Sequence, residues 1–94
     1  MKLIDVSKST AKGKKYTATF EKDNKTKRVH FGSSNHDDYT VHHDKTRRTN
    51  YRNRHVSGKT APADTPNALS YHLSWGDSTS MKENIKDFKK RYNV

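Results

Sequence analysis

The sequence predicts a small α+β domain, in which an antiparallel β-hairpin or three-stranded sheet is followed by two or three short helices packed on one face. Two observations predict this fold. The first third of the chain contains apolar residues that alternate with polar ones, which is the pattern of a half-buried strand. The remainder contains helix-start signals, each followed by apolar residues three or four positions apart. With 94 residues the chain has room for one domain, residues 1–94.

The predicted strands come first. Residues 3–6 form a short apolar start, and residues 16–20 and 26–31 both alternate with a period of two around the polar turn at 21–25. Together they predict a hairpin with a third strand beside it. Gly32 and the serines after it are expected to end the last strand. The basic, polar segment 7–15, which contains Gly13, is predicted to be a mobile loop.

Three helices are predicted after the sheet. Asp44 is a suitable N-cap for a helix over residues 45–56, which Ser57 and Gly58 would close. Residues 57–64 are then expected to be a second mobile loop. Thr65 followed by a proline predicts the start of a helix that ends at 75–76. Ser80 with Glu83 predicts a capping box for the last helix, whose apolar positions are 81, 85, 88 and 92.

The predicted core is thin. Leu, Ile, Val and Phe number 13 of 94 residues, a proportion typical of disordered chains when net charge is high. Nine aromatic residues favour a folded domain instead, because each buries a large apolar area. The residues expected in the core are Leu3, Val6, Tyr16, Ala18, Phe20, Val29, Phe31, Tyr39, Tyr51, Leu69, Leu73, Trp75, Ile85 and Phe88.

The charge distribution predicts an anionic partner. The formal net charge is +10, and residues 45–59 contain six basic residues and no acidic one. Such density disfavours folding by self-repulsion unless an anion offsets it, and phosphate is the commonest candidate. The residues expected to contact phosphate are Lys45, Arg47, Arg48, Arg52 and Arg54, with Lys14, Lys15, Lys27 and Arg28 as a second patch on the hairpin.

Other classes of function have weaker support. The chain has no cysteine, which excludes a disulfide scaffold, a cysteine-based zinc finger and a thiol nucleophile. It also has no apolar run long enough to span a membrane, and no signal peptide is visible. His42 or His43 with Asn50 or Asn53 and His55 could in principle form a metal-dependent nuclease site, but these residues lie along one predicted helix and its approach. We therefore expect no enzymatic activity, no cofactor and no bound metal.

The stretch from Phe31 to Arg91 resembles a family of small uncharacterised proteins encoded by giant, nucleocytoplasmic large DNA viruses. The residues of this sequence that match the family are Phe31, Gly32, the run from Asp38 to Asp44, Arg47, Tyr51, Arg54, His55, and the run from Ala68 to Trp75. The resemblance implies a viral origin and a single α+β domain, and it implies no particular activity.

The same pattern predicts a structural polar network that fixes the loop on the central helix. Its expected members are Asp38, Thr40, His42, Asp44 and His55, together with Arg47 and Arg54. If these residues are occupied in that way, Lys45, Arg48, Arg52 and the hairpin lysines are left to bind the anion.

Taken together, the sequence predicts a non-enzymatic, virus-encoded basic protein that binds DNA or RNA without sequence preference. Its expected place is the virion, or the host cytoplasm or nucleus during infection, and it is not expected to be secreted. The alternative is a minor capsid or protein-interaction component that meets an acidic viral protein and does not bind nucleic acid.

Overall fold

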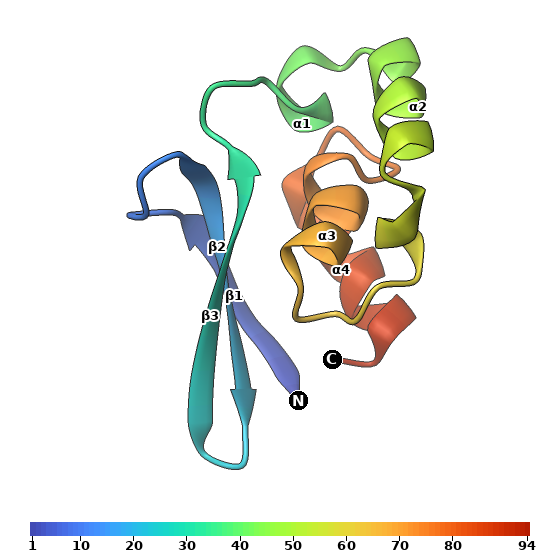
Figure 1. Cartoon of the computed structure of the whole chain (residues 1–94). Coiled ribbons are helices and arrows are strands. Elements are labelled where there is room, and N and C mark those ends of the chain that lie inside the picture. Colours follow the sequence, from blue (N-terminus) through green and yellow to red (C-terminus); the bar gives the residue numbers. More distant parts are fainter.

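The structure, a computed structural model, describes residues 1–94 and confirms the α+β fold. Three antiparallel strands lie in the order β1-β2-β3, and the helices that follow cover one face of this sheet (Figure 1). The elements are β1 (Lys2–Lys8), β2 (Lys14–Lys22), β3 (Lys25–Ser33), α1 (Tyr39–His42), α2 (Lys45–Arg54), the 3-10 turn η1 (Val56–Lys59), α3 (Pro66–Leu69), the π-helical turn η2 (Ser70–Ser74) and α4 (Met81–Tyr92). No helix is both long enough and apolar enough to cross a membrane.

The predicted strands are present and longer than expected. The turn between β2 and β3 contains only Asp23 and Asn24, and both have the positive φ that a tight hairpin turn requires. β3 ends at Ser33, within the segment expected to end it. Gly32, one residue earlier, has a φ of +79°, and a Cβ there would lie 3.3 Å from the ring of Tyr16. The sheet has two edge strands, β1 and β3, because only β2 is paired on both sides.

The first segment predicted to be a mobile loop, residues 7–15, is strand at both of its ends. Ser7 and Lys8 end β1, and Lys14 and Lys15 begin β2, so the connection is only residues 9–13. This connection is held by backbone hydrogen bonds at both of its ends, including one from the Ser9 N–H to the Lys15 carbonyl. The prediction of a loop is therefore correct only for residues 9–13, because the polar ends of β1 and β2 have the same composition as a loop.

The second segment, residues 57–64, is anchored to the rest of the fold. Gly58 lies buried within η1 and does not end α2. A Cβ at this position would be only 2.6 Å from the Asn67 carbonyl oxygen, so the close packing here requires glycine. The carbonyl of Ala61 accepts a hydrogen bond from the Tyr92 hydroxyl (2.8 Å), and Ala63 belongs to the hydrophobic core. The segment is therefore a packed part of the domain.

The helix starts follow the predicted capping residues. The Asp44 carboxylate accepts hydrogen bonds from the N–H groups of Thr46 and Arg47, and α2 begins at Lys45 as expected. Thr65 and Ser80 cap α3 and α4 in the same way through their hydroxyl groups. α2 ends at Arg54, two residues earlier than predicted.

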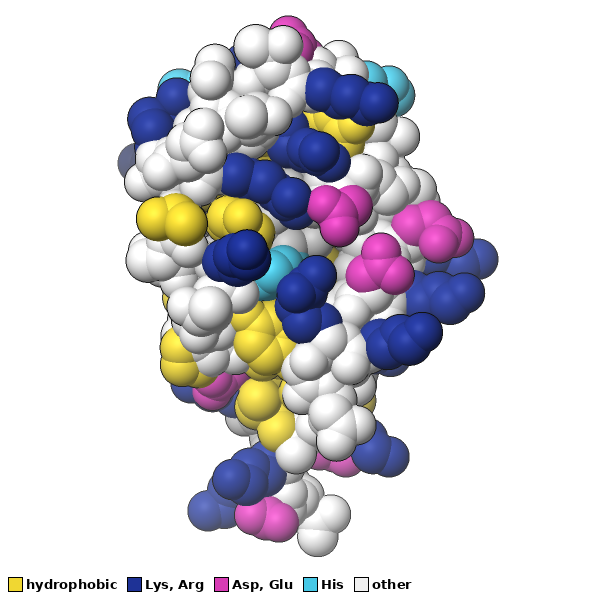
Figure 2. All heavy atoms as spheres, turned by 90° about the vertical axis from the view of Figure 1, so that its right-hand side faces the viewer, with side chains coloured by type: hydrophobic (Ala, Val, Ile, Leu, Met, Phe, Trp, Pro, Cys, Tyr) yellow, Lys and Arg dark blue, Asp and Glu magenta, His cyan; other side chains and the backbone are white.

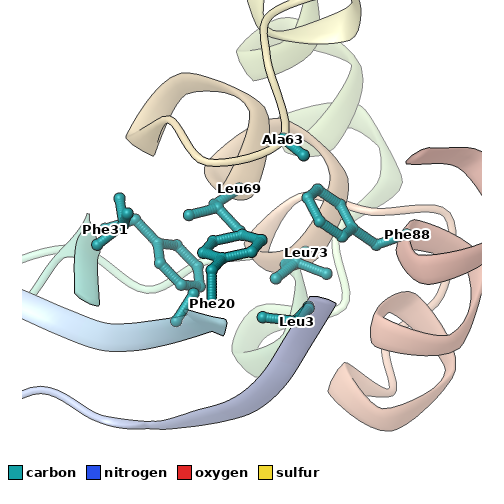
Figure 3. Close-up of a cluster of buried hydrophobic side chains, with 9 residues drawn as sticks. Leu3, Phe20, Phe31, Ala63, Leu69, Leu73 and Phe88 are labelled. Atoms are coloured by element: carbon teal, nitrogen blue, oxygen red, sulfur yellow. The ribbon is translucent and has the colours of Figure 1, made fainter. Parts of the chain in front are cut away.

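The core lies between the sheet and the helices α3, η2 and α4 (Figure 3). Of the predicted core residues, Tyr51 and Trp75 are only half-buried, and Val6, Tyr16 and Ile85 pack at the core's margin. The fully enclosed cluster is Leu3, Ala18, Phe20, Val29, Phe31, Ala63, Leu69, Leu73 and Phe88. The core holds the sheet against η2, and this arrangement fixes the geometry of the site described next.

Candidate functional site

A polar cleft opens where the sheet meets the helical layer. Its volume is about 760 Å³. One wall is the end of the sheet at which β2 begins and β3 ends, and the opposite wall is α2, both of which lie in the upper half of Figure 1. Residues 36–38 also border it, and its floor is made by α3, η2 and the residue after them. The side chains that line it include Lys14, Lys15, His36, Asp37, Asp38, Arg47, Asn50, Tyr51, Arg54, His55, Asn67, Ser70, Ser74 and Trp75.

Helix α2 turns a polar stripe towards this cleft. Residues 47, 50, 51 and 54 of this helix all line the cleft, as does the C-cap residue 55, and this spacing places them on one face of a helix. A globular protein normally turns an apolar stripe inward. Here the helix has no buried residue at all, so its inner face is held by polar and aromatic contacts and can be reached by a ligand.

The cleft has a surplus of positive charge. Arg47 and Arg54 are exposed and form no ion pair, and neither does Lys14 on the opposite wall. Lys15 is partly neutralised, because its Nζ lies 3.2 Å from the Asp38 carboxylate. Four cationic side chains therefore face two carboxylates, those of Asp37 and Asp38, and the formal surplus is two positive charges.

Asp38 is the fixed point of the predicted polar network. It is only 4 % exposed, yet each of its carboxylate oxygens accepts two hydrogen bonds. One oxygen accepts from the Thr40 backbone N–H and hydroxyl, and the other accepts from Lys15 and from the Tyr16 hydroxyl (3.0 Å). Burial, and to a lesser extent the Asp38 charge, raises the pKa of Tyr16, so its hydroxyl stays protonated and donates. The network thus ties the loop to the sheet, not to α2.

The remaining predicted members of the network lie elsewhere. The His42 Nδ1 accepts a hydrogen bond from the Asp44 N–H (2.9 Å), which leaves its buried Nε2 without a partner. Burial, followed by the nearby Arg47 charge, lowers the pKa of His42. His55 makes no side-chain hydrogen bond, and the guanidinium groups of Arg47 and Arg54 donate to none of the predicted partners. The one link from these arginines is the Arg47 backbone N–H, which donates to the Asp44 carboxylate. The prediction of one continuous network is therefore wrong beyond the pairs Asp38–Thr40 and His42–Asp44.

Aromatic rings form a column along the cleft. Trp75 and Tyr51 are stacked with ring centroids 4.3 Å apart and an interplanar angle of 7°, and His55 stacks on the other face of Tyr51 at 4.2 Å. His42 meets the far side of Trp75 at 5.2 Å. Burial raises the pKa of Tyr51, so its hydroxyl is a neutral hydrogen-bonding group near Ser70. The column explains why Tyr51 and Trp75 are only half-buried: they join the cleft to the core.

Two of the predicted phosphate-binding residues are structural anchors. The Arg52 Nε donates to the Trp75 carbonyl (2.8 Å), and its Nη1 pairs with the Asp77 carboxylate (3.0 Å). Arg48 donates to the carbonyls of Gly76 and Asp77, at 3.3 Å and 3.1 Å. The guanidinium groups lie over the rings of Tyr71 (Arg52) and Tyr39 (Arg48), at 4.8 Å and 5.0 Å from the centroids. Both guanidinium groups are therefore engaged within the fold, and their contact with phosphate stays a prediction.

The other predicted basic residues do not join the cleft. Lys45 is exposed at the start of α2, Lys27 pairs with Asp64 at 3.0 Å, and Arg28 is exposed on β3 opposite Thr19. On the face seen in Figure 2, Lys and Arg side chains are interspersed with Asp, Glu and apolar side chains, so no unbroken positive surface covers it. Of the nine predicted phosphate contacts, the structure brings four together: Lys14, Lys15, Arg47 and Arg54.

The sequence reasoning missed the neutral polar residues of the cleft. Asn50 was considered only for a nuclease site, although it shares the stripe of α2 and its spacing alone places it with Arg47 and Arg54. Ser70, Ser74 and Asn67 come from the floor, and nothing in their sequence context indicates that they face Arg47. No group of three or more His, Asp or Glu side chains is placed to hold a metal ion.

Comparison with known sequences gives one result. The sequence pattern of a family of unknown function, DUF5754, matches residues 4–55, which is more than half of the chain. The chain belongs to the DUF5754 family. No curated protein and no solved structure matches it significantly. The segment shared with the DUF5754 family runs from β1 to the end of α2, and it includes all four cationic residues of the cleft but not the floor.

Proposed function

We propose that this protein is a non-enzymatic, virus-encoded basic protein that binds nucleic acid without sequence preference, through contacts between the cleft and backbone phosphates. Its expected location is the virion or the infected host cell. Phosphate contacts position a protein on nucleic acid but read no sequence, and no recognition helix or other base-reading motif is evident in the sequence.

One observation supports this proposal above the others. Arg47 and Arg54 have no acidic partner in the fold, although Arg48 and Arg52 on the neighbouring face of α2 are both hydrogen-bonded. The two unpaired guanidinium groups face a cleft whose opposite wall supplies Lys14 and Lys15. An arginine fork matches the oxygens of a phosphate and binds them bidentately. An anion in the cleft would offset the charge that the fold leaves uncompensated.

The proposal is tested by the salt dependence of binding. Fluorescence anisotropy with mixed-sequence DNA and RNA oligonucleotides is measured between about 50 and about 200 mM salt. With three or four phosphate contacts, the slope of log K against log salt is expected to be roughly −2 to −3.5. Removing two contacts by Arg47→Ala plus Arg54→Ala makes the slope shallower by about 1.5.

A matched control removes the same charge from another helix. Lys82→Ala plus Lys86→Ala changes two exposed, unpaired lysines on α4 and leaves the cleft intact. This variant is expected to keep the native slope. A flat profile for the native protein, or equal slopes for the two double variants, would count against phosphate binding in the cleft. Absence of nucleic-acid binding together with stable association to an acidic viral protein would favour the alternative, a minor capsid or protein-interaction component.

A further inference from the structure

We infer that the cleft takes a single-stranded segment of nucleic acid, and that one of its bases stacks on the exposed face of His55. This inference rests on the proposed function and narrows its ligand from any nucleic acid to an unpaired strand. Four features of the cleft support it: the size of the cleft, the position of its cations, its column of rings and the polar groups on its floor.

The cleft is sized for a nucleotide and not for a double helix. Its volume of about 760 Å³ falls within the range of small-ligand pockets, roughly 300–1,000 Å³. The cations lie on both walls, Lys14 and Lys15 on the sheet and Arg47 and Arg54 on α2. A strand that enters between the walls reaches both sets. A duplex, which is too wide to enter, meets only the rim.

The two arginines are spaced along the cleft. Arg47 and Arg54 are seven residues apart on α2, which is about two turns or roughly 10 Å. Both point to the same side, and Asn50 and Tyr51 lie between them on the same stripe. The stripe therefore has a phosphate-binding group at each end, and the groups between them can contact a sugar or a base.

The column of rings has one open end. Tyr51 is covered on one face by Trp75 and on the other by His55, with interplanar angles of 7° and 25°. His55 is exposed, has no second ring partner and makes no side-chain hydrogen bond. Base stacking on aromatic side chains is the usual way in which proteins hold unpaired strands without reading their sequence. A base on His55 would extend the column, with Arg54 next to it in the chain.

The floor of the cleft offers hydrogen bonds to the edge of a base. Ser74 borders the cleft and is 1 % exposed, and its Oγ has no hydrogen-bond partner in the fold. Buried polar groups are nearly always paired, so an unpaired hydroxyl at a cleft is a place where a ligand group is expected. Ser70 and the side chain of Asn67 lie on the same floor. In a base-paired strand the Watson–Crick edge is already occupied, so only an unpaired base can offer that edge to the floor.

The experiment compares three polyanions on the intact protein. The probes are a mixed-sequence single strand, the same strand annealed to its complement, and inorganic polyphosphate, which has phosphates but no bases. The single strand is expected to bind at least about tenfold more tightly than the duplex. His55→Ala is expected to weaken single-strand binding roughly five- to 140-fold, the range for loss of one stacked base. His55→Phe keeps a stacking face and is expected to restore binding, and neither variant changes polyphosphate binding.

The outcomes separate this inference from the proposed function. Arg47→Ala plus Arg54→Ala is expected to weaken binding of all three probes. Equal affinity for single strand and duplex, or single-strand binding that His55→Ala leaves unchanged, overturns the inference while phosphate binding stands. Loss of polyphosphate binding in His55→Ala also overturns it, because the ring would then act only by shaping the cleft. Failure of all three probes to bind overturns both.

Discussion

Replacing Asn84 with alanine is expected to destabilise the fold far more than replacing an exposed asparagine would. Asn84 lies on the inner face of α4 and is 1 % exposed. Its amide nitrogen donates to the carbonyls of Leu73 and Ser78, both at 2.8 Å, and its amide oxygen accepts from the Ser78 N–H at 2.9 Å. One side chain thus joins α4 to the end of η2 and to the turn that leads into α4.

The magnitude follows from the three backbone groups that the change leaves unpaired. A buried polar group without a partner costs about 1–3 kcal/mol. The Leu73 carbonyl is buried and should cost about 2 kcal/mol, whereas the Ser78 groups are reached by water and should cost about 1 kcal/mol each. Alanine favours the helix over asparagine by about 0.5 kcal/mol. The free energy of unfolding should therefore fall by about 3–4 kcal/mol, from a total of roughly 5–14 kcal/mol for a chain of this length.

Urea denaturation followed by far-UV circular dichroism measures this loss, and thermal unfolding should show a midpoint lowered by roughly 12–25 °C. Asn53→Ala is the matched control, because Asn53 is exposed on α2 and makes no side-chain hydrogen bond. That variant should stay within about 0.5 kcal/mol of the native protein. A loss below about 1 kcal/mol for Asn84→Ala would refute the reasoning, since it would mean that the three backbone groups find other partners.

Three further predictions concern the rest of the domain. Burial lowers the pKa of His72, so the folded state binds fewer protons than the unfolded chain, and stability should be lost as pH falls below about 6.5. The urea midpoint should therefore drop between about pH 7.5 and pH 5.5, and it should drop less in the His72→Gln variant. Arg52→Ala should lower the free energy of unfolding by about 1–2 kcal/mol, whereas Arg54→Ala should lower it by less than about 0.5 kcal/mol. Equal losses for the two variants in urea titrations would contradict the assignment of Arg52 as an anchor. Gly76→Ala should cost about 2 kcal/mol or more, because its Cβ would overlap the His72 carbonyl and lie 2.5 Å from a side-chain carbon of Asn84; an unchanged thermal midpoint would argue against this packing.

Local signals in the sequence predicted the elements well. The alternation of apolar and polar residues predicted β2 and β3. Asp44, Thr65 and Ser80 each cap, through a side-chain oxygen, the helix that each was expected to start. These features succeed because each depends on interactions within a few residues of the chain. The apolar stripe of α4 was also predicted. Its inner face includes one polar residue, Asn84, whose burial makes sense only because its amide nitrogen donates to the Leu73 carbonyl, which is distant in the chain.

The orientation of α2 could not be predicted from the sequence. Helical spacing alone places Arg47, Tyr51 and Arg54 on one face and Arg48 with Arg52 on another, and the structure agrees. A helix normally reveals its inner face by apolar residues, and α2 has basic residues on both faces. Which face is anchored depends on the carbonyl groups at 75–77, and these are more than twenty residues away in the chain. The cleft itself could therefore not be predicted, although all four of its cationic residues were named.

The lysines on the outer strands have a consequence for any experiment on this protein. β1 and β3 each leave a row of backbone N–H and C=O groups open to another chain, and charged side chains along such strands are a common protection against intermolecular pairing. Lys2 and Lys8 on β1, and Lys25 and Lys27 on β3, stand along these rows. Charge-removing variants at these positions would expose the sheet to self-association, so a drop in apparent affinity there would report aggregation instead of a lost contact.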